Sequence, residues 1–149
     1  MNFEEYLQKS RDIADEEKEI LDELSLKKSE NLNKIEIRAA KSSLQTLIEN
    51  AIGKAKKILK HFNCPIVPSR SKDAVYFLYE CGAISEEMYS ALVSAIGFRN
   101  CLMHDYMKFD IDVMFKILRE KRYLDVYKFI VSDVKYSKTI INRIESYSL

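Results

Sequence analysis

The chain has 149 residues, enough to bury one hydrophobic core without metal ions or disulfides, so we expect a single domain over residues 1–149. Only 3 glycines and 2 prolines stand among many Lys, Glu, Leu and Ile residues, which favours long helices over turn-rich sheets. The net charge of +1 excludes the strong overall positive field of a passive nucleic-acid coat, so any RNA contact must be local.

Helical periodicity dominates the first half of the chain. Apolar residues recur three and four positions apart over residues 2–24, which predicts a first helix with charged outer faces. After a polar segment, the same spacing resumes at residue 37 and predicts a second helix. This helix should end near Phe62, because the following segment 63–68 contains both prolines.

Two further helices are predicted beyond this loop. Ser71 or Asp73 can cap a short third helix, and Gly82 terminates it, since glycine adopts the left-handed cap conformation. Ser85, followed by two glutamates, is a good start for a fourth helix. The inner side of that helix should carry Tyr89, Leu92, Val93, Ile96, Asn100 and Met103.

The last part of the chain continues the helical pattern. Asp110 or Asp112 is expected to open a fifth helix, and apolar spacing runs on to Ile141, either as one helix or with a break near residues 120–123. No strand-like alternation occurs. The sequence therefore predicts an all-α protein, an antiparallel bundle of about five helices.

The cysteines and the N-terminus bear on the compartment. Cys64, Cys81 and Cys101 are an odd number at wide spacings, so we expect reduced thiols in a cytosolic, cytoplasmic protein. His61 and Cys64 lack two further ligands, so we expect no metal and no cofactor. The N-terminus is acidic and no stretch approaches about 20 apolar residues, so we expect no membrane association.

One octapeptide gathers unusual chemistry, the segment RNCLMHDY from Arg99 to Tyr106 at the end of the fourth helix. At about 100° per residue, Asn100 and His104 are neighbours, and Arg99 and Tyr106 share another face. Arg99 and His104 lie about 140° apart and cannot meet at one phosphate on a straight helix. Either the helix unwinds before His104, or two copies of it face each other across a two-fold axis.

These side chains suit cleavage of RNA without a metal ion. Histidine titrates near neutral pH, so His104 can move the proton of a ribose 2′-OH, while Arg99 clamps the phosphate and stabilises its developing charge. Asn100 can fix the tautomer of His104. The alternative is purely structural: Arg99 and Asp105 as a surface ion pair, with His104 as an ordinary residue at a helix end.

The same octapeptide resembles the R-x-x-x-x-H-x-Y signature of HepT proteins in the HEPN superfamily. The segment SLQTLIENAIGKAKKIL resembles that family's L-Q-x-x-x-E-x-x-x-x-x-A pattern, with Gln45, Glu49 and Ala55 in matching places. The segment SRSKDAVYFLYECGAIS resembles its short helix, glycine stop and restart. Together the three matches span about residues 37–130.

The resemblance implies a homodimeric endoribonuclease toxin that cleaves RNA at a composite site. It implies Arg99 and His104 as catalytic residues, Asn100 as a polar helper, and Tyr106 as the residue that an MNT-type nucleotidyltransferase antitoxin modifies with AMP. The small residues Ala91, Ala95 and Gly97 would let two copies of the helix approach closely. Two features depart from the family pattern: a longer tail over residues 134–149, and a lysine at position 54 that we take as surface charge.

Two further expectations concern charged residues. Glu49 either orients the guanidinium of Arg99 or pairs with a lysine of its own helix. The basic clusters at residues 54–60 and 119–122 are expected to be solvated faces, or else to guide an RNA backbone. Two other functions remain open: a catalytically silent HEPN module that binds a nucleotide or docks a nucleotidyltransferase, and a plain helical scaffold.

Overall fold

The protein is all-helical, as predicted. The computed structural model describes residues 1–148, and within that range the chain forms seven α-helices, two short 3-10 helices and no strand. Their bounds are α1 (Phe3–Ser25), η1 (Ser29–Asn31), α2 (Lys34–His61), α3 (Ser71–Glu80), α4 (Glu86–His104), η2 (Tyr106–Lys108), α5 (Ile111–Arg119), α6 (Tyr123–Val131) and α7 (Lys138–Glu145).

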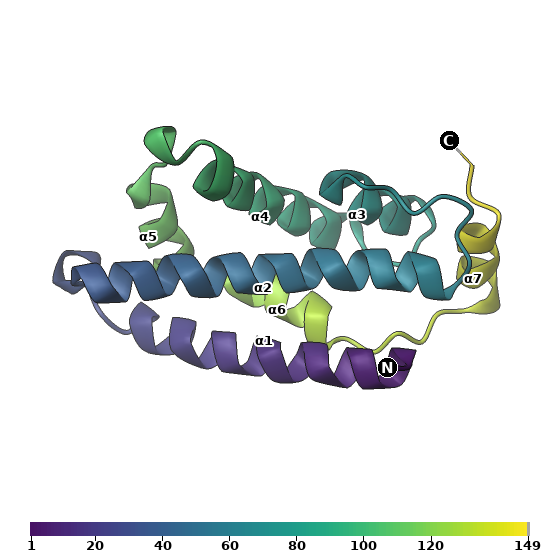
Figure 1. Cartoon of the computed structure of the whole chain (residues 1–149), viewed down its shortest axis with the longest axis horizontal. Helices are drawn as coiled ribbons and strands as arrows, with labels where there is room; N and C mark the ends of the chain where they lie inside the picture. The colour runs from purple at the N-terminus through teal and green to yellow at the C-terminus, as the bar shows by residue number, and fades with distance from the viewer. Residues whose placement is uncertain (149) are drawn as a thin grey trace.

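The helices form a bundle around α2. In Figure 1, α1 lies antiparallel along one side of α2, α3 and α4 lie on the other, and α6 packs behind. Burying a leucine-sized side chain stabilises the fold by about 2 kcal/mol, so the interlocked apolar faces of these helices hold it together. Side chains fully shielded from solvent include Ala14, Leu21, Leu47, Ala55, Ile58, Leu59, Leu78, Met114 and Ile130.

Most helix ends follow the local sequence signals. The side chain of Ser85 accepts a hydrogen bond from the Met88 N–H, and Asp110 does the same for Asp112, so both predicted N-caps are confirmed. Gly82 adopts φ +82° directly after Cys81, the C-cap of α3. The predicted cap of α3 is wrong: Ser71 is its first helical residue, and its hydroxyl is used elsewhere.

The last part of the chain breaks into three helices, and the break at residues 120–123 is confirmed. Lys121 takes φ +51° between α5 and α6, and α6 ends before residue 132. In the third piece, α7, Ile144 is fully buried, and Tyr147, two residues beyond the end of α7, places its ring 4.2 Å from that of Phe77 in α3. The C-terminal tail is therefore an integral part of the bundle.

Tyrosine hydroxyls bind α6 to α1. Tyr123 donates to Asp22 at 2.6 Å, and Tyr127 donates to Asp15 at 2.5 Å. Burial, followed by the hydrogen bond to Asp22, raises the pKa of Tyr123 to about 12. These bonds fix the register of two helices that are distant in sequence.

Lys54 corrects our expectation of surface charge, because its side chain is fully buried. Its ammonium donates to the carbonyl oxygens of Phe129, Ile130 and Ser132 at 2.8, 2.9 and 2.7 Å. Carbonyls at the end of α6 have no partner within the helix, so Lys54 caps that helix from inside the bundle. Burial, followed by the positive charge of Arg11, lowers the pKa of Lys54 to about 8.

None of the helices described, up to residue 148, is long and apolar enough to cross a membrane.

Candidate functional site

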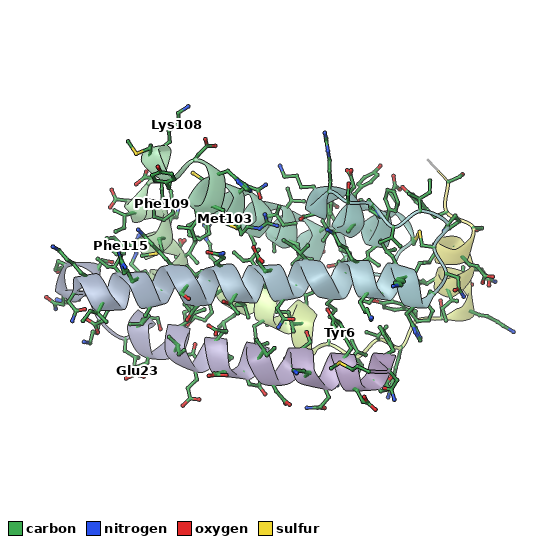
Figure 2. All side chains as sticks on the ribbon, in the orientation of Figure 1. Tyr6, Glu23, Met103, Lys108, Phe109 and Phe115 are labelled. Carbon is green, nitrogen blue, oxygen red and sulfur yellow. The ribbon has the colours of Figure 1, made fainter. Side chains whose placement is uncertain are left out.

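The octapeptide lies where α4 ends, as predicted. Asp105 leaves the helical conformation at φ −122° and forms the C-cap, with its N–H still bonded to the Cys101 carbonyl. A single 3-10 turn, η2, follows and leads into α5. Figure 2 shows Met103, Lys108 and Phe109 at this corner of the bundle, with Lys108 projecting away from it.

Arg99 points inward, with only 14% of its side chain exposed. Its Nη1 donates to Asn100 Oδ1 at 2.9 Å, and its Nη2 donates to Ser71 Oγ at 3.1 Å. Its Nε is buried and forms no hydrogen bond within the described residues; the carboxylate of Glu49 lies 3.8 Å away from it. The guanidinium thus lies at the meeting point of α2, α3 and α4.

Glu49 approaches Arg99 from α2, which is the first of the two arrangements that its position allowed. Its side chain is 46% exposed, so solvent screens the attraction and the pair contributes at most about 1 kcal/mol to stability. At 3.8 Å the pair orients the guanidinium by charge rather than by a hydrogen bond. The Glu49 carboxylate therefore attracts the guanidinium without taking an N–H donor, and each terminal nitrogen keeps one N–H beyond its bond to Asn100 or Ser71.

His104 is the last residue of α4, and it is exposed. The helix stays regular up to this residue, so the alternative that it unwinds before His104 is wrong. Five residues at about 100° each leave His104 about 140° around the axis from Arg99. Within one chain, the two side chains therefore face different directions.

The remaining residues of the motif are distributed around this end. Asn100 bonds to Arg99 rather than to His104. Asp105 forms no ion pair with Arg99 within residues 1–148, because it lies beyond the end of the helix. Tyr106 is 71% exposed on η2, so the expectation that it shares a helical face with Arg99 is wrong. Met103, expected on the inner side of α4, is exposed as well.

Ser71 is the contact that the sequence did not reveal. Its serine-before-helix pattern indicated a cap, and no local signal connects position 71 with position 99. Only the packing of α3 against α4 brings the hydroxyl to the guanidinium.

An apolar groove lies beside the motif on α4. Ala91, Ala95 and Phe98 line a cavity of about 620 Å³ on another side of α4, together with residues of α2, α5 and α6. A Cβ placed on Gly97 would meet nothing within 4 Å. Among residues 1–148, no three His, Cys, Asp or Glu side chains converge in a way that would hold a metal ion.

Known proteins share this fold. A tri-AMPylated HEPN toxin from Shewanella oneidensis, solved in complex with MNT antitoxin, matches with a TM-score of 0.76 and 19% identity over 87% of this chain and 96% of its own. A chain of a toxin–antitoxin structure with AMP-PNP matches with a TM-score of 0.71 and 19% identity over 87% of this chain and 97% of its own. No curated protein sequence shows significant similarity to the chain.

The bundle, with an Arg and His motif at the end of its fourth helix, defines an all-helical protein with the fold of that HEPN toxin. The model of the family described as "Ribonuclease HepT-like" matches residues 3–132. The chain belongs to this HepT-like family, which the resemblance of its three motifs predicted. The match ends at Ser132, so the segment that leads to α7, and α7 itself, lie outside it.

Proposed function

We propose that this protein is a metal-independent endoribonuclease toxin, paired with and neutralised by an MNT-type nucleotidyltransferase antitoxin. The observation that carries the proposal is the arrangement of the motif: a largely buried guanidinium that makes no hydrogen bond to a carboxylate, and an exposed imidazole five residues later. Membership of the HepT-like family and the toxin–antitoxin complexes among its structural neighbours support it.

The reaction follows from these two groups. His104 accepts the proton of a ribose 2′-OH while that oxygen attacks the adjacent phosphorus. The bond from phosphorus to the 5′ oxygen breaks, the departing oxygen takes up a proton from water, and a 2′,3′-cyclic phosphate remains. Arg99 binds the phosphate and stabilises the negative charge that builds up on it.

In a homodimer, Arg99 and His104 from different chains can reach one site, although the two side chains of a single chain face different directions. Because α4 stays helical through His104, Arg99 and His104 of one chain point about 140° apart. Two antiparallel copies of this helix end, related by a two-fold axis, place His104 of one chain near Arg99 of the other. The open space at Gly97 and the groove at Ala91 and Ala95 favour a close approach of two copies along α4.

Tyr106 is the residue that we propose as the AMP acceptor. Its hydroxyl is exposed and makes no hydrogen bond within the described residues, so a partner's active site can reach it. The tyrosine oxygen attacks the α-phosphorus of ATP held by the antitoxin, and pyrophosphate leaves. The new phosphodiester lies two residues from His104, where its negative charge repels incoming RNA.

Cleavage of single-stranded RNA by the purified protein tests the enzymatic part. Arg99→Ala and His104→Ala should each lower the rate by about a hundredfold or more, since each removes a group that acts in the transition state. His61→Gln is the matched control, because His61 is the other histidine of the chain and stacks on Phe3, at the opposite end of α2 from the motif. If both alanine variants cleave as fast as the parent, the catalytic roles are wrong. RNA binding without cleavage would favour the silent binding module.

Co-expression with the partner nucleotidyltransferase tests the regulatory part. Intact mass and peptide mapping should find an adenylyl group on the peptide that contains Tyr106, and none after Tyr106→Phe, which keeps the ring and removes the acceptor oxygen. Full neutralisation of the toxin with an unmodified Tyr106 peptide would mean that the antitoxin acts by steric cover instead.

A further inference from the structure

Ser71 makes a hydrogen bond to Arg99 that neither its own helix nor the sequence motif explains. It is the first residue of α3, one position after the N-cap residue Arg70, and its hydroxyl bonds to none of the helix N–H groups. Instead it accepts a hydrogen bond from Arg99 Nη2 at 3.1 Å, across 28 positions of sequence. The hydroxyl therefore does not serve its own helix end, and its hydrogen bond goes to the motif.

The backbone that carries Ser71 is firmly held. Ala74, Val75 and Leu78 of α3 are all buried in the core, and the ring of Tyr147, just beyond α7, lies near that of Phe77 on the same helix. A hydroxyl on a short side chain attached to such a helix has little freedom. It therefore presents a fixed acceptor to the long and flexible side chain of Arg99.

Three acceptors from three helices surround the guanidinium, and they differ in charge. Asn100 and Ser71 are neutral and hold one N–H donor on each terminal nitrogen, whereas Glu49 lies at 3.8 Å and is half exposed. A neutral acceptor fixes the orientation of the guanidinium without cancelling its positive charge. The charge remains available to an anionic ligand.

We propose that Ser71 is a positioning residue, which holds Arg99 in the orientation that receives the phosphate of the RNA. This inference rests on the proposed ribonuclease function. Ser71 acts through Arg99, so its removal should affect the transition state, in which the placement of the guanidinium matters most, more than the binding of the substrate.

Kinetics of RNA cleavage by three variants of position 71 test the proposal. Ser71→Ala removes the acceptor and should lower kcat about tenfold with little change in KM, and Ser71→Thr, which keeps a hydroxyl, should recover most of that loss. Ser71→Asp should lower kcat/KM further, by about a hundredfold, because a carboxylate neutralises the guanidinium. Ser69→Ala is the control, since this exposed serine lies two residues earlier and its hydroxyl makes no hydrogen bond within residues 1–148.

A direct view of the arginine side chain separates this inference from the ribonuclease proposal. By NMR, the Nη resonances of Arg99 should be resolved in the parent and in Ser71→Thr, and averaged by rotation in Ser71→Ala. If the Nη resonances of Arg99 are resolved, or averaged, to the same degree in the parent and in Ser71→Ala, the positioning role is overturned, whether or not the protein cleaves RNA. Parent-like kcat in a folded Ser71→Ala protein, with Arg99→Ala inactive, would also overturn it and leave the proposed function intact.

Discussion

Replacing Lys54 by methionine should remove a pH-dependent part of the free energy of unfolding. Methionine keeps most of the apolar stem and removes the ammonium that bonds to the carbonyls of Phe129, Ile130 and Ser132. At pH 7 the variant should be less stable by about 1–3 kcal/mol, because the carbonyl of the buried Ile130 loses its donor and the Phe129 carbonyl keeps only the Ser132 hydroxyl.

The pH dependence follows from the lowered pKa of Lys54. The ammonium titrates near pH 8 in the folded protein and at 10.5 in the unfolded chain, so between these values the unfolded state binds more protons. Stability from this group therefore rises with pH in that window. Between pH 7 and about 9.5 the rise is at most about 2 kcal/mol, and the three carbonyl acceptors, which favour the charged form, reduce it.

Urea unfolding at a series of pH values measures this effect. The scan should stop near pH 9.5, because the buried Tyr123, with a pKa raised to about 12, makes the protein less stable as the pH rises above 10. Comparing parent with Lys54→Met cancels the contributions of the groups they share. Lys60→Met, on an exposed lysine of the same helix, should keep the rise. A parent and a Lys54→Met protein whose stability difference is constant from pH 7 to 9.5 would refute the reasoning.

Two other outcomes follow from the proposed function. RNA cleavage should persist in the presence of a chelator, because a histidine and a guanidinium supply the proton transfer and the charge stabilisation; loss of activity that added Mg²⁺ restores would contradict this mechanism. If the site is shared across a two-fold axis, a mixture of the inactive Arg99→Ala and His104→Ala proteins should regain about a quarter of parent activity, since half the dimers then hold one intact site. A monomer at micromolar concentration in light scattering, or no recovery in the mixture, would exclude the shared site.

Local signals in the sequence were sufficient for the helices and for the position of the motif. Helical periodicity and caps act within one or two turns, so Ser85, Gly82 and Asp110 mark helix ends in the sequence as they do in the structure. The break at residues 120–123 was one of two possibilities, because continuous apolar spacing does not distinguish one helix from two. The motif and its family could be identified because the residue types at fixed spacing are themselves the signal.

The environment of each charged group was decided only by the tertiary structure. In the sequence, Lys54 belongs to a run of lysines typical of a solvated face, and Ser71 has the pattern of a helix cap. The packing of α6 against α2 buries Lys54, and the packing of α3 against α4 brings Ser71 to Arg99. Glu49 had two possible partners, and the approach of α4 to α2 selected Arg99. A side chain's spacing along its own helix fixes the face on which it lies, whereas its burial and its partner depend on which other helix covers that face. That choice depends on the packing of the whole bundle.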